Sequence, residues 1–186
     1  MSHLLTRFFS LSTLRTVLIY ALILTISGFL GNLWMTRDQA SGFMPQIVTQ
    51  DIAGHSVNLG YPRQPGESLQ LPDNLEGKPL LVYFFAEWCP VCKFQNPVIS
   101  AIQRDYPVIA ISMQSGNAAN VQRYLSEQDL DFRVVNDEDG RISRQLGVNG
   151  VPATFILNQQ GRIKYSTRGY TTGPGLRSRL WLSSQS

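Results

Sequence analysis

The sequence predicts a mixed α/β fold, in which helices cover both faces of a central sheet, preceded by one transmembrane helix. Two continuous apolar runs of β-favouring residues, 78–86 and 108–113, are typical of central strands. Segments with helical spacing follow each run, and this alternation indicates an α/β sheet. A long uncharged stretch near the N-terminus supplies the additional helix. With 186 residues, the chain has room for one domain with its own core and one further segment.

The composition argues against a nucleic-acid partner. The net charge is only +3, and acidic and basic residues nearly balance from Met35 onward. Two of the basic residues, Arg7 and Arg15, precede the uncharged stretch and are explained as signals for membrane insertion. The hydrophobic fraction of 43% is that of an ordinary globular protein.

A transmembrane anchor is expected at 16–36, because no charged residue lies between Arg15 and Arg37. A run of about 20 apolar residues is long enough to cross the hydrocarbon core of a bilayer as a helix. Tyr20 and Trp34 stand near its two ends, where aromatic side chains favour the membrane interface.

The charges around this run predict its orientation. The positive-inside rule places residues 1–15 in the cytoplasm and everything after about residue 37 on the other side of the membrane. The alternative is a cleaved signal peptide, whose apolar region is about 7–15 residues long and ends in a small-x-small cleavage site. The run in this chain is longer, and it ends in N-L-W-M without such a site. An uncleaved anchor is therefore expected.

After the anchor, the polar and small residues 37–44 suit a tether, and the soluble domain is expected at 45–186. Two short apolar runs at 46–49 and 56–59 flank the turn signal D-I-A-G-H and predict a hairpin. The segment Y-P-R-Q-P-G-E-S at 61–68 is rich in turn formers and predicts a surface loop.

The rest of the domain follows from periodicity and turn signals. Its expected elements are a strand at 78–86, a helix at 90–104 with Pro97 as a kink, a strand at 108–113, a helix at 117–128, a strand at 132–135, a short helix at 140–146, a hairpin of 153–157 with 162–166, and a helix at 176–182.

The pentapeptide W-C-P-V-C at 88–92 contains both cysteines of the chain, Cys89 and Cys92. Cys89 is expected at the start of a helix, where free N–H groups and the helix dipole stabilise an anion. A thiolate there has a pKa below the usual value of about 8.5 and is a nucleophile at neutral pH. Pro90 suits the first helical position. Cys92, one turn further along, can resolve a mixed disulfide formed at Cys89.

Two structural explanations for this pair are weaker. A purely structural disulfide would close too short a loop to restrict the unfolded chain much. A zinc site needs four ligands, and the chain has no second cysteine pair and only two histidines, His3 and His55. No metal and no cofactor is therefore predicted.

A second signal lies at Val151-Pro152, in the segment G-V-N-G-V-P-A-T-F-I-L-N, where a turn leads directly into a buried strand. A bond before proline is the one peptide bond that becomes cis at low cost, and we expect a cis bond here. This pair alone is a weak signal, but it becomes specific when it follows W-C-x-x-C in this order of strands and helices.

Together these segments resemble the thioredoxin family. The matching stretches are K-P-L-L-V-Y-F-F-A-E-W-C-P-V-C-K at 78–93 and G-V-N-G-V-P-A-T-F-I-L-N-Q-Q-G-R-I at 147–163, and the element order agrees over about 45–183. The anchor and the additional N-terminal hairpin resemble the membrane-tethered branch of TlpA-like and cytochrome c-maturation thioredoxins. Within it, the chain is most similar to the suppressor for copper sensitivity D group.

The resemblance implies a thioredoxin fold with an N-terminal hairpin extension and a protein-disulfide reductase activity. By this resemblance Cys89 attacks and Cys92 resolves, as a redox disulfide. Substrate binding falls on the loop before the strand and on the residues flanking the motif: Gly150, Val151, Pro152, Trp88 and Pro90. Implied partners are protein thiols and disulfides and a transmembrane electron donor. The implied location is the bacterial inner membrane, with a periplasmic catalytic domain acting in copper tolerance or cytochrome c maturation.

The chain also departs from the family. Tyr83 occupies the position of a buried acid found in many thioredoxins, and Gln95 replaces a glutamate of several cytochrome c-maturation relatives. The nearest carboxylate in the sequence is that of Glu87, which is expected to face solvent. Proton transfer from Cys92 is therefore expected to rely on water. The alternative function is a copper carrier that binds Cu(I) through the two thiolates. Copper carriers with this fold add a histidine after the cysteines, and here no histidine follows His55.

Overall fold

The computed structural model describes residues 11–60, 75 and 77–185. The loop expected at 61–68 lies outside the described residues. The chain divides into two compact units, Met1–Arg37 and Asp38–Ser186.

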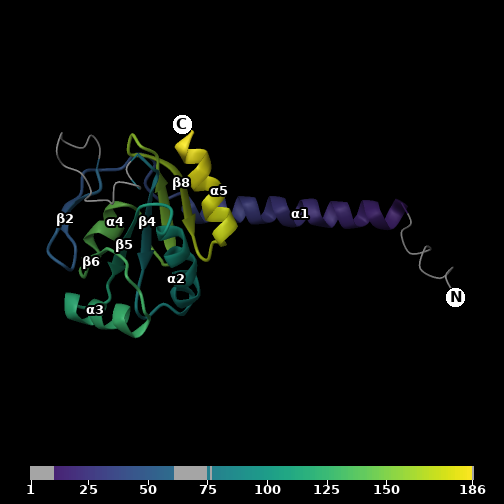
Figure 1. The fold of residues 1–186 in the computed structure, drawn as a ribbon. Coiled ribbons are helices and arrows are strands. Elements are labelled where there is room, and N and C mark those ends of the chain that lie inside the picture. Colours follow the sequence, from purple (N-terminus) through teal and green to yellow (C-terminus); the bar gives the residue numbers. More distant parts are fainter. Residues whose placement is uncertain (1–10, 61–74, 76, 186) are drawn as a thin grey trace. The chain divides into compact units, whose positions relative to one another are not determined.

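The first unit contains one long helix, α1 (Leu11–Thr36) (Figure 1). Large apolar side chains along it are exposed, and they are Leu14, Val17, Leu18, Ile19, Tyr20, Leu22, Ile23, Leu24, Ile26 and Leu30. Among the residues that the structure describes, no helix combines the length and the apolar character needed to cross a membrane. The membrane span expected at 16–36 stays a prediction.

The second unit is built on a six-stranded sheet with the strand order β1-β8-β7-β4-β5-β6. The strands are β1 (Gly42–Phe43), β4 (Leu80–Phe85), β5 (Val108–Met113), β6 (Val134–Asp137), β7 (Ala153–Leu157) and β8 (Arg162–Arg168). β4, β5 and β6 run parallel, whereas β7, β8 and β1 join as antiparallel neighbours. The predicted mixed sheet is confirmed.

Strand β4 lies at the centre of this sheet, between β5 and β7, and all six of its residues are buried. Its side chains alternate between two cores. Tyr83 and Phe85 face one core, and Val82 and Phe84 face the other. The uninterrupted apolar run predicted as a central strand is therefore covered on both sides.

Helices cover both faces of the sheet, as predicted. Buried residues of α2 (Pro90–Gln103), α3 (Ala118–Glu127) and α5 (Gly173–Ser184) pack in the core that contains Tyr83. The other core is closed by α4 (Arg141–Gln145) and by the hairpin of β2 (Val48–Gln50) and β3 (Ser56–Asn58).

The β2–β3 hairpin is attached to the domain through Asp51. The Asp51 carboxylate accepts hydrogen bonds from Arg133 Nε at 2.9 Å, from the His55 backbone N–H at 2.9 Å and from the Ala53 backbone N–H at 3.0 Å. Burial of Asp51 would raise the pKa of its carboxyl, but the His55 N–H and Arg133 outweigh that effect and lower the pKa. The carboxylate therefore stabilises the hairpin in its ionised form.

Several elements differ from the predicted bounds, among them β1, β6 and α5. Strand β1 lies inside the stretch expected to be a tether, and it pairs with the edge of β8. Strand β6 begins at Val134 rather than at residue 132. Helix α5 begins at Gly173 rather than at residue 176, because the Thr172 side chain caps it and Pro174 fits its first turn.

Candidate active site

The turn after β4 places Cys89 at the start of α2, as predicted. Cys89 is the N-cap residue, with φ −93° and ψ 108°, and Pro90 occupies the first turn of the helix. The Cys89 sulfur accepts a hydrogen bond from the Cys92 backbone N–H at 3.2 Å. This N–H is one of the groups that a helix start leaves without an internal partner, so the helix itself supplies a donor to the sulfur.

Cys89 and Cys92 are joined in a disulfide, with their Cα atoms 5.3 Å apart. The two residues differ in accessibility. Cys89 is 4% exposed and Cys92 is 0% exposed. A thiol from a partner protein can therefore approach only the Cys89 side of the bond.

The turn at Val151-Pro152 lies beside this disulfide. The peptide bond is cis, as predicted. The carbonyl oxygen of Val151 lies 3.5 Å from the Cys89 sulfur. The carbonyl oxygen of Pro152 accepts a hydrogen bond from the Gly169 N–H at 2.7 Å, which ties the turn to the end of β8. The structure thus brings two sequence signals, the cysteine pair and the proline turn, into one site.

Exposed apolar side chains surround the start of α2. Trp88 is 57% exposed, and its indole N–H donates to the Gln114 carbonyl at 3.1 Å. Val91 is 43% exposed and Phe94 is 74% exposed. Val91 and Phe94 were not predicted as part of the site, although their spacing of three places them on one helix face. Such a patch beside a reactive disulfide suits contact with another protein.

A neutral hydrogen-bonded network lies under the site, where many thioredoxins carry an acid. The Tyr83 hydroxyl donates to Asn96 Oδ1 at 2.9 Å, and Asn96 Nδ2 donates to the Tyr124 hydroxyl at 3.0 Å. Burial raises the pKa of both Tyr83 and Tyr124 above the ordinary phenol value. Both phenols are therefore protonated at neutral pH, and the network holds no charge.

Gln95 is fully buried and bonds to a distant loop. Its Nε2 donates to the Thr171 carbonyl at 3.0 Å, and its Oε1 accepts from the Thr171 N–H at 2.7 Å. The side chain thus satisfies both backbone groups of one residue between β8 and α5. A glutamate at this position could accept the bond from the Thr171 N–H but, when ionised, could not donate the bond to the Thr171 carbonyl.

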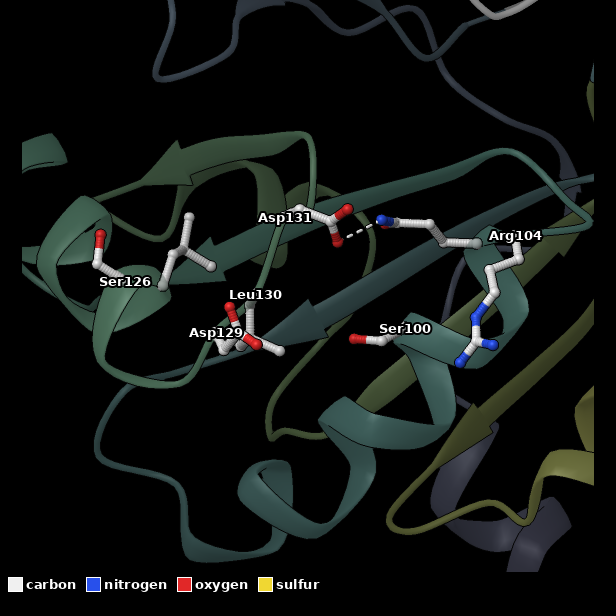
Figure 2. Close-up of a pocket in the computed structure, with 8 residues that line it drawn as sticks. Ser100, Arg104, Ser126, Asp129, Leu130 and Asp131 are labelled. Atoms are coloured by element: carbon white, nitrogen blue, oxygen red, sulfur yellow. Dashed lines mark hydrogen bonds between the residues drawn. The ribbon is translucent and has the colours of Figure 1, made fainter.

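A separate pocket of about 510 Å³ lies at the other end of α2 (Figure 2). Its lining includes Gln103, which donates a hydrogen bond to Asp131 at 2.5 Å. The remaining lining residues are Ser100, Arg104, Leu125, Ser126, Asp129 and Leu130. None of the predicted site residues lines this pocket, so the disulfide is the stronger candidate for the active site.

A metal site is not evident from the side chains. Across residues 11–60, 75 and 77–185, no group of three or more His, Cys, Asp and Glu residues is arranged to hold a metal ion.

The chain is similar to known proteins over most of its length. A thioredoxin-like protein of Haemophilus influenzae is 33% identical over 139 residues, which cover 74% of this chain and 75% of the relative. A thiol:disulfide interchange protein DsbE of Yersinia pestis is 27% identical over 176 residues, which cover 92% of this chain and 89% of the relative.

The fold is also found among solved structures. A secreted disulfide oxidoreductase of Mycobacterium tuberculosis, homologous to Escherichia coli DsbE, superposes with a TM-score of 0.56. It is 24% identical, and the match covers 74% of this chain and 96% of that protein. The model of the AhpC/TSA family matches residues 52–166, which include both cysteines and the proline turn. The chain therefore belongs to the AhpC/TSA family, and its second unit has the thioredoxin fold.

Proposed function

We propose that this chain is a thiol-disulfide oxidoreductase that exchanges disulfides with other proteins through Cys89 and Cys92. The observation that carries this proposal is the position of Cys89, which caps α2 and lies 3.5 Å from the Val151 carbonyl. The names of the relatives support the same chemistry, because they include a thiol:disulfide interchange protein.

The reducing reaction begins with both cysteines as thiols. The Cys89 thiolate attacks one sulfur of the partner's disulfide, so a Cys89–partner disulfide forms and the partner's other sulfur leaves as a thiolate. The Cys92 thiolate then attacks the Cys89 sulfur and releases the partner's second thiolate. Two electrons pass from the protein dithiol to the partner, and the protons that Cys89 and Cys92 lose leave both partner sulfurs as thiols. The oxidising reaction is the reverse.

The surroundings of Cys89 favour its role as the attacking group. The Cys92 N–H points at its sulfur, and the start of a helix stabilises negative charge there. Cys92 is fully buried and lies over uncharged residues, including the Tyr83 phenol. Burial disfavours a thiolate, so Cys92 reacts after the mixed disulfide has formed.

The partner is expected to bind as an extended chain beside the turn at 150–152. The backbone of Gly150 and Val151 would offer hydrogen-bonding groups to that chain, in the manner of an added strand. Trp88, with its exposed ring, and Pro90, which is also exposed, would contact the partner on the other side of the disulfide.

We further propose that residues 16–36 anchor the protein in the bacterial inner membrane, with residues 1–15 in the cytoplasm. The catalytic domain, which is the unit Asp38–Ser186 and includes β1, then lies on the periplasmic side. The exposed apolar side chains along α1 support this arrangement. An anchored enzyme suits a donor that is also in the membrane, because tethering raises the effective concentration of the two proteins. The proposed direction is reduction, in copper tolerance or cytochrome c maturation.

The test of the activity is a redox titration of the Cys89–Cys92 pair combined with a disulfide-reduction assay on a protein substrate. A reduction potential near about −270 mV with turnover supports a reductase, whereas a value near about −120 mV identifies an oxidant. A domain that exchanges no disulfide at any potential would overturn the proposal. In cells that lack the protein, sensitivity to copper and loss of c-type cytochromes distinguish the two biological roles.

A further inference from the structure

A line of polar side chains connects the proline turn to the helix that carries the cysteines. The Thr154 hydroxyl lies 2.6 Å from the Thr167 hydroxyl, and the latter lies 3.2 Å from the Thr171 hydroxyl. Thr171 in turn holds the Gln95 amide through both of its backbone groups, at 3.0 Å and 2.7 Å. We call Gln95, Thr154, Thr167 and Thr171 the polar clamp.

The ends of the polar clamp are close in sequence to the reacting groups. Thr154 follows Pro152 by two residues on β7, and Gln95 follows Cys92 by three residues on α2. The clamp therefore connects β7 with α2, and the site requires a fixed distance between these two elements. The same two elements meet at the site itself, where Val151 O lies 3.5 Å from the Cys89 sulfur.

Three of the four members of the clamp are buried, and Thr171 is half-buried. Gln95 is 0% exposed, Thr154 is 2% exposed and Thr167 is 5% exposed. Burial of a polar side chain costs free energy unless the side chain forms hydrogen bonds. Apolar side chains of the same shape would be sufficient if stability were the only requirement. Hydrogen bonds add direction to such a contact, which fixes the relative position of two surfaces more narrowly than apolar packing does.

We propose that Gln95, Thr154 and Thr167 are positioning residues that hold the Val151–Pro152 turn at the distance from Cys89 that a bound polypeptide requires. This inference rests on the proposed function, because it concerns the same disulfide exchange. The hydrogen bonds of the clamp do not include either cysteine sulfur, and Gln95, Thr154 and Thr167 are buried away from a docking protein. The clamp acts on the docking of an extended chain, and a small disulfide that reaches Cys89 without pairing with the turn does not depend on it.

The main variant is the double substitution Thr154→Val with Thr167→Val. Valine keeps the shape of threonine, and the double substitution removes both members of the buried pair. Only the half-buried Thr171 hydroxyl loses a partner, so folding is retained. Gln95→Met is the second variant, which keeps the side-chain length and removes both bonds to Thr171. The matched controls are Thr154→Ser with Thr167→Ser, which keeps the hydroxyls, and Ser112→Ala, which removes a buried hydroxyl that has no hydrogen-bond partner.

The full-length protein and its variants are assayed with two substrates, a protein disulfide such as that of insulin and a small aromatic disulfide. We expect kcat/KM for the protein disulfide to fall by about tenfold in the valine pair and in Gln95→Met, mainly through KM. We expect kcat/KM for the small disulfide to change by less than about twofold. The serine pair and Ser112→Ala should keep the wild-type ratio between the two substrates.

Three results would count against the inference or the proposed function, and they can be told apart. If the wild type exchanges both disulfides and the valine pair and Gln95→Met keep the wild-type ratio, the clamp has no positioning role. If both substrates lose activity in proportion, the clamp is only structural and the inference is likewise wrong. If the wild type reduces neither disulfide, the proposed function itself fails.

Discussion

The sulfur of Cys89 lies 3.5 Å from the carbonyl oxygen of Val151, although 62 positions separate the two residues in the chain. Cys89 follows the end of β4, and Val151 precedes the start of β7. These two strands are antiparallel neighbours in the sheet. Strand pairing therefore brings the nucleophile and the docking backbone together. The predictions below begin with this pair.

Replacement of each cysteine should have a different result. Cys89→Ser is expected to lower disulfide exchange to background, because the accessible sulfur is lost. Cys92→Ser should accumulate Cys89–partner disulfides, because no second thiol is present to release the partner. Non-reducing electrophoresis followed by mass spectrometry measures both outcomes. As a control, limiting alkylating reagent applied to the reduced wild type should label Cys89 first. Preferential labelling of Cys92 would reverse the two roles.

Removal of residues 1–36 should leave a folded domain, since Asp38–Ser186 forms a compact unit by itself. A longer deletion, 1–44, should cost about 2–4 kcal/mol in the free energy of unfolding. It removes β1 from the edge of β8 and also Met44, which is only 1% exposed. Urea denaturation of both proteins gives the comparison. Equal stabilities would mean that the residues around β1 contribute nothing to the domain.

Acid should weaken the attachment of the β2–β3 hairpin through Asp51. Folding lowers the pKa of this carboxyl below its unfolded value, so its stabilisation is present above about pH 4 and is lost as the pH falls through the folded-state pKa. Asp51→Asn should cost about 1–3 kcal/mol at pH 7, because the charged bond from Arg133 is lost.

The diagnostic observation for Asp51 is the difference in unfolding free energy between wild type and Asp51→Asn, measured from about pH 7 to about pH 3. This difference should shrink toward low pH. A constant difference would show that the ionised carboxylate is not the source of the stabilisation. Glu138→Gln, at an exposed carboxylate in another turn, is a control for the general effect of removing one charge.

Alkali should weaken the core beneath the cysteines. Folding raises the pKa of Tyr83 and Tyr124, so their contribution is fully present below the unfolded value of about 10 and is lost as the pH rises above it. Tyr83→Phe should cost about 1–3 kcal/mol at pH 7, because Asn96 Oδ1 loses its donor. The same variant should lose less additional stability than the wild type between about pH 9 and about pH 11. Absorbance of ionised tyrosine at alkaline pH gives an independent measurement, and early ionisation of a buried phenol would refute the assignment.

Much of the fold follows from local patterns in the sequence. The run at 80–85 reads as a buried strand because it has no polar residue, and the bounds of β5 and β7 were predicted without error. Cys89 was placed at a helix start because a turn and Pro90 surround it. In each case the decisive information lies within a few residues.

The remaining features depend on contacts that a local pattern does not contain. Strand β1 has two residues and exists because the edge of β8 is free to pair. Helix α5 begins in a glycine- and proline-rich segment that resembles a loop until Thr172 caps it. The bonds between Gln95 and Thr171 join residues 76 positions apart, so the sequence could identify Gln95 as unusual but could not identify its partner.

The strand order also has a consequence for how the protein is made. β4 occupies the middle of the sheet but pairs with β7, which is synthesised much later. Likewise, β1 at one edge cannot pair until β8 has been synthesised. Contacts between distant segments slow the folding of a domain, because a long loop must close before they form. The two cysteines therefore emerge from the ribosome well before the turn at Val151 can cover them. During that interval the nascent chain carries an open dithiol, which other thiol-oxidising proteins can reach before the enzyme has acquired its own site.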